Sequence, residues 1–398
     1  MIKARYQYTN FIYPFIIEED KYAKYIAELL CNKNCRIRLL QKEKDLNLYS
    51  YFTENIKKYF FPTFEYNTTK IKDIEKEKDK KIISSLPCAI FDYDIGKDVF
   101  GKTDKEDSIF FKITRIEIIC FNTGICFLNL KTYIDDIENF TDILNYNYKF
   151  KGITKEKAFN DGIKIQTDVF DSIKQVTDLV KGITKKEYIE QNFLMQGYAC
   201  IDAENWNEKN DFSNIENSFY KYIYAVPYDQ NTEFDRDNIQ SAYIVSDLKY
   251  SKCGITAKTA NLLVSSIETY NYTKLIEDYN NQYFYTYIIE IYKKMYLQKL
   301  LIKIEKNTES IAEELLKFKD LVIEKELTKD IFGLEYSTNI QKALGTPELY
   351  NKVQEDFVLV AERQSIKKAD KVNRWILIAL CFSLIVNIVN FLILFSVL

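Results

Sequence analysis

The chain has 398 residues, with 55 Lys and Arg, 58 Asp and Glu, and a formal net charge of −3. It contains no histidine, which excludes Ser-His-Asp catalysis, Cys-His catalysis and His-ligated zinc sites. The negative balance argues against nucleic acid as a partner. The high content of Lys, Ile, Asn and Tyr is typical of AT-rich bacterial coding sequences.

Residues 1–150 are expected to form an α+β domain. The segment 5–17 reads as a strand, and 20–30 reads as a helix with apolar residues on one face. The clearest feature is a hairpin over 110–134, whose two β-rich runs are joined by Asn122-Thr123-Gly124. Strands combined with helices on one face predict an α+β layer.

Alternation in the second strand of this hairpin separates two kinds of side chain. Cys126, Leu128 and Leu130 share one face, while Asn129 and Lys131 share the other. The pattern therefore predicts an apolar and a polar face for this strand.

The next two regions are read as mixed α/β (151–278) and helical (279–346). In the mixed region, 219–226 and 241–249 are predicted strands because aromatic and β-branched residues dominate them. In the helical region, 283–306 and 310–331 carry apolar residues at helical spacing.

A long helix is expected at the C-terminal end. Gly345 breaks the chain, Thr346 suits an N-cap and Pro347 suits the first helical turn. No Gly or Pro follows Pro347, so one helix is predicted from there to residue 398, with a stalk over 347–374.

The run 375–398 contains no charged residue and exceeds the roughly 20 apolar residues that a bilayer crossing requires. It is predicted to be a single C-terminal transmembrane helix. Basic residues remain on the cytoplasmic side, so the N-terminal body is placed in the cytoplasm and the protein in the inner membrane. The residues expected at the membrane interface are Lys367, Lys368, Lys371, Arg374 and Trp375.

Three polar residues inside this run, Ser383, Asn387 and Asn390, share one helical face. Polar groups in lipid usually face another helix or water. The face is interpreted as an interhelical contact, a water-lined path, or polar residues without a role.

The stalk carries apolar residues in a three-four spacing: Tyr350, Val353, Phe357 and Val360. This spacing is typical of a coiled-coil seam. Packing against the helices at 283–306 and 310–331 explains it equally well.

Few residues suggest catalysis. Asp92 and Asp94 follow a strand-like run, and this D-x-D pattern resembles the opening motif of haloacid-dehalogenase-like phosphotransferases, in which the first Asp is the nucleophile and the second is the acid/base. Gly96 stands where that family has Thr or Val. No phosphate-binding loop of the form G-x-x-x-x-G-K-[ST] occurs, and the eight cysteines lack zinc spacing. The expectation is no enzyme, no cofactor and no metal site.

The order of parts resembles the CorA-type divalent-cation channel family, mainly over residues 280–398. That family has two spans joined by a Gly-Met-Asn loop, whereas this chain has one span and no such tripeptide. The resemblance implies a homo-oligomer in which a cytoplasmic domain controls a pore.

The sequence thus predicts a homo-oligomeric, tail-anchored membrane protein. Its body would sense a small ligand or a protein partner and act through the membrane helices, as a channel or as a stress or defence effector. The alternatives are a membrane-anchored scaffold or adaptor, and a membrane-tethered phosphotransferase-like enzyme.

Overall fold

The computed structural model describes the chain except for a set of segments. These are residues 66–76, 95–98, 103–108, 152–163, 166–193, 230–242, 246–248, 305–307, 319–325 and 398. In the last helix, the side chains of 364, 367, 368 and 387–398 also lie outside the description. The chain divides into two compact units: residues 1–296 with 319–347, and residues 297–318 with 348–398.

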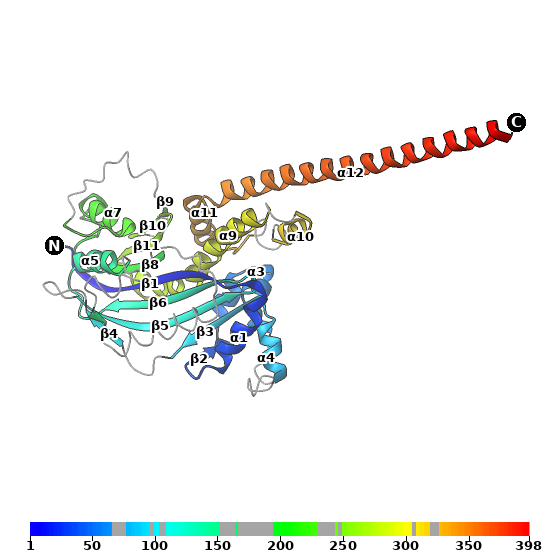
Figure 1. Ribbon diagram of the computed structural model, residues 1–398. Coiled ribbons are helices and arrows are strands. Elements are labelled where there is room, and N and C mark those ends of the chain that lie inside the picture. Colours follow the sequence, from blue (N-terminus) through cyan, green and yellow to red (C-terminus); the bar gives the residue numbers. More distant parts are fainter. Residues whose placement is uncertain are drawn as a thin grey trace. The chain divides into compact units, whose positions relative to one another are not determined.

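The first unit is built on one large sheet with the strand order β2-β3-β5-β6-β1-β8-β11-β10-β9 (Figure 1). Neighbouring strands are antiparallel except for β8 and β11, which are parallel. The path comprises β1 (Ala4–Ile16), β2 (Cys35–Ile37), β3 (Cys88–Tyr93), β5 (Phe110–Phe121), β6 (Ile125–Ile134), β8 (Leu194–Ile201), β9 (Tyr243–Val245), β10 (Ser251–Ile255) and β11 (Thr259–Ser265). Off this path, β4 (Val99–Lys102) pairs with β5 and with β7 (Lys164–Ile165).

The predicted hairpin is present as β5 and β6. Gly124 in the connecting turn has a φ of 78°, in the left-handed region that glycine adopts without strain. The start of the chain lies beside the start of α5 (Phe140–Lys151), where Lys3 forms an isolated β-bridge with Asn139, and both ribbon views show the N-terminus at this place. The body combines one large sheet with helices, so the α+β prediction for it is confirmed.

The other long regular elements of the described chain are helices. The first unit contains α1 (Tyr22–Cys31), α2 (Leu46–Tyr51), α3 (Glu54–Phe60), α4 (Glu77–Ser84), α5, α7 (Glu216–Tyr224), α8 (Thr269–Asn280), most of α9 (Gln282–Ile304) and α11 (Ile331–Leu344). The second unit contains the end of α9, α10 (Thr308–Phe318) and nearly all of α12 (Thr346–Val397).

One predicted strand, 219–226, is wrong, because most of it belongs to helix α7. The buried residues Phe219, Tyr222 and Ile223 recur at intervals of three and four, which is the helical period. The strand was predicted because aromatic and β-branched side chains such as these are common in strands.

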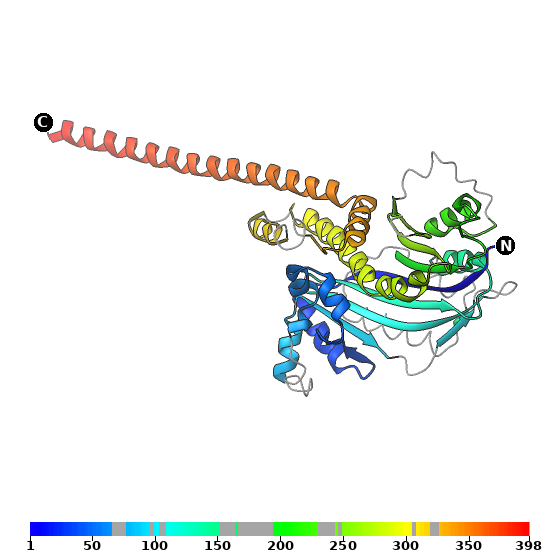
Figure 2. The ribbon, with the colours of Figure 1, turned by 180° about the vertical axis from the view of Figure 1, so that it is seen from behind.

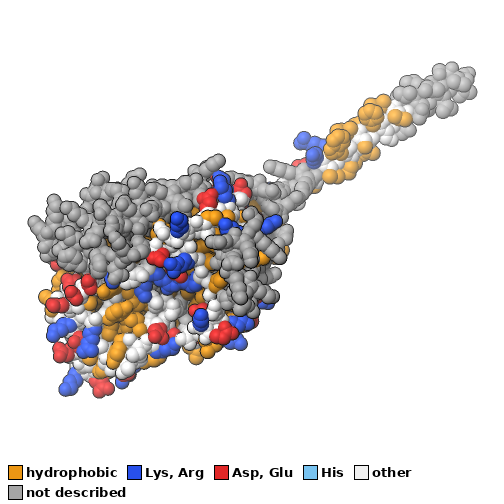
Figure 3. Space-filling view, turned by 90° about the horizontal axis from the view of Figure 1, so that it is seen from below, with side chains coloured by type: hydrophobic (Ala, Val, Ile, Leu, Met, Phe, Trp, Pro, Cys, Tyr) orange, Lys and Arg blue, Asp and Glu red, His pale blue; other side chains and the backbone are white. Residues whose placement is uncertain are grey.

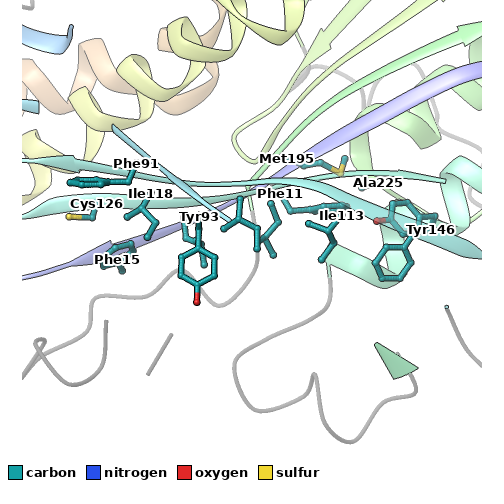
Figure 4. Packing of buried hydrophobic residues seen from close by; sticks show 14 of the residues in the cluster. Phe11, Phe15, Phe91, Tyr93, Ile113, Ile118, Cys126, Tyr146, Met195 and Ala225 are labelled. Carbon is teal, nitrogen blue, oxygen red and sulfur yellow. The ribbon is translucent and has the colours of Figure 1, made fainter. Parts of the chain in front are cut away.

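The two faces of the sheet differ in chemistry. One face carries the main apolar cluster, which includes Phe11, Ile118 and Met195 and is joined by Tyr146 of α5 (Figure 4). The opposite face receives α8, which packs on β8 and β11, and α9, whose Tyr285 reaches Glu117 on β5; the yellow-green helices lie beside the strands in the rear view (Figure 2). There the ring of Tyr292 lies 4.1 Å from that of Phe121. The functional site described below lies on this second, helical face.

The second unit contains α12 as one continuous helix of 52 residues. In the part of the chain that the structure describes, no helix carries an apolar stretch of the length and hydropathy that a membrane crossing requires.

The predicted transmembrane helix over 375–398 is corrected by this finding. The predicted single-pass localisation in the inner membrane is contradicted with it. The same holds for the three predicted functions, which were a tail-anchored sensor, a membrane-anchored scaffold and a membrane-tethered enzyme, because each required the membrane helix. Figure 3 shows hydrophobic side chains along the described part of α12. Among them, Trp375, Leu377 and Phe382 are each more than 60% exposed.

Candidate functional site

A row of polar side chains crosses the helical face of the sheet through five adjacent strands. Asp92 on β3 is paired with Glu117 on β5, and Glu117 is paired with Asn129 on β6. Asn10 on β1 is paired with Gln196 on β8. The row is buried apart from Asp92 at its edge. A buried polar row at the centre of a sheet requires that its members satisfy one another's hydrogen bonds.

Hydrogen bonds join the row into one network. The Nδ2 of Asn129 donates to Glu117 Oε2 at 3.1 Å and to Asn10 Oδ1 at 3.2 Å. Asn10 Nδ2 then donates to Gln196 Oε1 at 2.8 Å, and Gln196 Nε2 donates to the carbonyl of Tyr279 at 2.9 Å. The network therefore runs from the charged edge of the sheet to the end of helix α8.

An irregularity in β5 determines which side chains reach this face. The pairing register of β5 against β6 shifts between Ile113 and Arg115. Ile113 and Ile116 both belong to the apolar cluster, although strict alternation would put residues three apart on opposite faces. The extra residue at the shift therefore turns Arg115 and Glu117 to the helical face. Bulges of this kind often lie beside functional sites.

Arg38, which follows β2, is the centre of the charged part of the site. It donates through Nε to Asp92 Oδ2 at 3.0 Å and through Nη1 to Glu117 Oε1 at 2.5 Å. It also contacts Asp92 Oδ1 and the hydroxyl of Tyr285 on α9. Burial alone would lower the pKa of Arg38, but Tyr285, Glu117 and Asp92 together raise it above its ordinary value. Arg38 is therefore a permanent cation.

Glu117 is the buried counter-charge, with 1% of its side chain exposed. Burial would raise the pKa of Glu117, but Arg38, Arg115 and the hydrogen bond from Asn129 outweigh that effect and hold it at about 2. The Tyr285 hydroxyl also donates to Glu117 Oε1, at 3.0 Å. Glu117 is thus ionised throughout the physiological range.

Arg115 is held more loosely than Arg38. Its Nε lies 3.3 Å from Asp92 Oδ1, its Nη2 lies 3.4 Å from Glu117 Oε1, and 31% of its side chain is exposed. The partly exposed guanidinium retains N–H donors that can turn toward a ligand.

Lys131 lies opposite Arg115 on β6. Its Nζ donates to Asn280 Oδ1 at 2.6 Å and lies 4.2 Å from the centre of the Tyr8 ring. Burial lowers the pKa of Lys131 to about 8, and the charge of Arg115 adds to this effect. Among the described residues, both contacts of this ammonium are uncharged, and the carboxylate that offsets its charge, Glu117, acts at a distance.

The charge count defines the chemistry of the site. Three cations, Arg38, Arg115 and Lys131, face two carboxylates, Asp92 and Glu117. Like charges opposite each other on neighbouring strands are destabilising, and an anion between Arg115 and Lys131 would relieve that repulsion. The arrangement is suited to binding a small oxyanion.

Of the two D-x-D residues, Asp92 belongs to this cluster and Asp94 lies outside it. Both carboxylate oxygens of Asp92 accept from guanidinium groups, and Asp94 pairs with Arg36 at 3.1 Å. Asp92 is thus held by two arginines, Arg38 and Arg115. Among the described residues, no group of three or more His, Cys, Asp or Glu side chains could hold a metal ion.

The structure brings the predicted seam residues of α12 to one side of the helix. Val353 is buried, and Tyr350, Phe357 and Val360 are half-buried. Tyr350 accepts a hydrogen bond from Gln354 Nε2 at 2.9 Å. Coiled-coil pairing of this seam remains a prediction.

The residues expected at the membrane have a different outcome. Lys371, Arg374, Trp375 and Ser383 are exposed. The side chains of four others lie outside the described residues: Lys367, Lys368, Asn387 and Asn390. With the transmembrane helix corrected, the interface role of the basic residues and the membrane role of the polar face are also withdrawn.

Sequence reasoning found part of the site and missed the rest. The prediction that Asn129 and Lys131 share a polar face is confirmed by the pairing of both residues with charged partners on β5. Arg38, Arg115 and Glu117 were missed, although Arg115 and Glu117 are two apart in the same predicted hairpin. Because alternate residues of a strand lie on one face, their spacing could have predicted that Arg115 and Glu117 lie together. No family model, no curated protein and no solved structure matches this chain.

Proposed function

We propose that this chain is a non-enzymatic protein that binds a small anionic ligand between Arg115 and Lys131. One observation carries the proposal: Arg115 and Lys131 lie opposite each other beside Arg38, Asp92 and Glu117, so that three cations are offset by only two carboxylates at a partly exposed place on the sheet. An oxyanion would accept hydrogen bonds from the Lys131 ammonium and from the Arg115 guanidinium, and charge-assisted bonds of this kind are the strong ones. The negative net charge of the chain favours a small anion over a polyanion as the partner.

A purely structural role would predict a balanced cluster, in which each charge has an opposite charge as its neighbour. Lys131 departs from that expectation because the contacts of its ammonium among the described residues are a neutral amide and an aromatic ring. Burying a cation without a paired carboxylate is unfavourable. The imbalance supports ligand binding at this place.

The proposal is tested by the thermal stability of the full chain in orthophosphate and in succinate, each against chloride at the same ionic strength. A ligand that binds only the folded state raises the midpoint Tm, and the increase grows with the logarithm of the ligand concentration above Kd. We expect one of the two anions to raise Tm in the parent, and the choice between them distinguishes a phosphate from a carboxylate ligand.

The variants Lys131→Met and Arg115→Met should lose most of this increase. The matched control is Lys24→Met, because Lys24 is 75% exposed on helix α1 and should leave the response unchanged. Equal Tm in all three salts, or an undiminished response in Lys131→Met, would show that the cluster is only structural.

A second candidate is self-association through α12. The helix exposes large apolar side chains along much of its described length, among them Val358, Leu359, Ile366, Val372 and Trp375. Exposed apolar surface of this extent is typical of an interaction site. Light scattering in mild non-ionic detergent gives the mass of the full chain. We expect an oligomer that Trp375→Glu with Leu377→Glu dissociates, and a monomeric parent would refute the idea.

A further inference from the structure

Next to the cation pair, the same face of the sheet carries a strip of tyrosines. Tyr6 and Tyr8 lie on β1 and Tyr198 lies on β8. The rings of Tyr8 and Tyr198 are stacked at 5.5 Å with an interplanar angle of 7°. Tyr6 meets both rings edge-on, at 6.4 Å and 6.3 Å. The strip is thus a fixed aromatic platform with Tyr6 at its edge.

The platform and the cations share one face because of strand alternation. Tyr6, Tyr8 and Asn10 are two apart on β1, and Asn10 is paired with Lys131. The Lys131 ammonium lies 4.2 Å from the Tyr8 ring. One ring therefore separates the ammonium from Tyr6.

Tyr6 is open to a ligand, whereas the other two rings are not. Tyr6 is 41% exposed, while Tyr8 and Tyr198 are buried at 1% and 0%. Burial raises the pKa of Tyr6, and the neighbouring Tyr133 on β6 adds to the effect. Tyr133 is half-buried, and its hydroxyl donates to Asp135 at 3.1 Å. The exposed ring of Tyr6 therefore offers an aromatic surface on which a planar group can stack.

We propose that the ligand of this site is a nucleoside monophosphate, with its phosphate between Lys131 and Arg115 and its base against Tyr6. The inference rests on the proposed function, since it requires the oxyanion site, and it adds the identity of the group attached to the oxyanion. Stacking of a base on an aromatic side chain contributes about 1–3 kcal/mol and tolerates any base, because every base has a π face.

The loop-based phosphate sites of nucleotide-binding proteins need glycine-rich sequence, and this chain contains no such loop. A sheet face supplies the two required elements in another way. The phosphate meets side-chain cations on β5 and β6, and the base meets the edge of the tyrosine strip on β1. Neither element depends on a helix N-terminus.

Calorimetric titration of the full chain with AMP, ribose 5-phosphate and adenosine separates these elements. AMP is expected to bind at least about tenfold more tightly than ribose 5-phosphate, which corresponds to roughly 1.4 kcal/mol of stacking. Adenosine alone should bind more weakly than AMP because it lacks the phosphate.

Two variants assign the contacts. Tyr6→Leu should weaken AMP about tenfold and leave ribose 5-phosphate unchanged, because the exposed ring contributes only to the base. Lys131→Met should weaken both ligands. Tyr228→Leu is the matched control, since Tyr228 is a comparably exposed tyrosine (46%) on the loop after α7, and it should change neither affinity.

The outcomes distinguish the two levels of the proposal. If AMP and ribose 5-phosphate bind equally, and Tyr6→Leu changes neither, the nucleotide inference is wrong while anion binding stands. If neither of these phosphates binds, the nucleotide inference is wrong, and if orthophosphate and succinate both leave Tm unchanged, the anion site itself is refuted. Adenosine binding as tightly as AMP would likewise overturn the nucleotide inference.

Discussion

Arg115 and Lys131 lie directly opposite each other on β5 and β6, so that two cations occupy neighbouring positions of one antiparallel pair. Such a pair is unfavourable in itself, and it is tolerated here because Glu117 lies two residues along β5 from Arg115. The charge of this carboxylate stabilises both cations. A change at Glu117 is therefore expected to affect both the proposed anion site and the stability of the sheet.

The first prediction concerns Glu117 as the buried counter-charge. Glu117→Gln leaves Arg38 and Arg115 without their buried partner, and removing one member of a buried ion pair is strongly destabilising. We expect the free energy of unfolding to fall by about 3 kcal/mol, measured by urea denaturation. Glu54→Gln, at an exposed glutamate that pairs with Lys57, should behave like the parent. Equal stability of the two variants would contradict the role of Glu117.

The second prediction concerns acid stability. The pKa of Glu117 is lowered from its ordinary value of 4.5 to about 2, where the charges of Arg38 and Arg115 outweigh the effect of burial. The stabilisation from this carboxylate is fully present above about pH 4.5 and is lost as the pH falls toward 2. In this window, the Tm of the parent should fall more steeply than that of Glu117→Gln. Parallel pH profiles would exclude Glu117 as the titrating group.

The third prediction is that Lys131 is unfavourable for stability. Burial lowers its pKa from 10.5 to about 8, with a further contribution from Arg115. The charged ammonium therefore destabilises the folded state below pH 8, by roughly 3 kcal/mol at most. This penalty is relieved as the pH rises from about 8 to 10.5.

Lys131→Met removes the charge together with one hydrogen bond to Asn280. The variant should be at least as stable as the parent at pH 7, and its advantage should shrink by about pH 10. Thermal denaturation at the two pH values checks this. A residue that binds ligand at the expense of stability behaves in this way, whereas a clear loss of Tm at pH 7 would indicate a structural role.

The fourth prediction concerns a second buried ion pair, between Glu290 and Lys293 on α9. Both side chains are at most 2% exposed and lie 3.0 Å apart, and Glu290 Oε1 also accepts from Ser337 and Gln341 on α11. Each single change, Glu290→Leu or Lys293→Leu, leaves a buried charge unpaired. A double-mutant cycle in urea should give a coupling energy of about 2 kcal/mol. Additive effects would show that the two charges do not stabilise each other.

The amino-acid sequence by itself determined the local features. The hairpin over 110–134 follows from two β-rich runs around a glycine turn, and the shared face of Asn129 and Lys131 follows from strand alternation, since both depend on residues close in the chain. The helix that begins at Thr346 follows from its N-terminal residues and from the absence of later Gly or Pro.

Only the tertiary structure decided where the charges meet. Arg38 and Glu117 are 79 residues apart and become partners because β2, β3 and β5 are neighbours in the sheet. The register shift beside Ile113 turns Arg115 to the helical face, although an uninterrupted period of two would have put it with the apolar cluster. Strand order arises from packing of the whole chain, and the bulge interrupts the alternation on which a prediction of register depends.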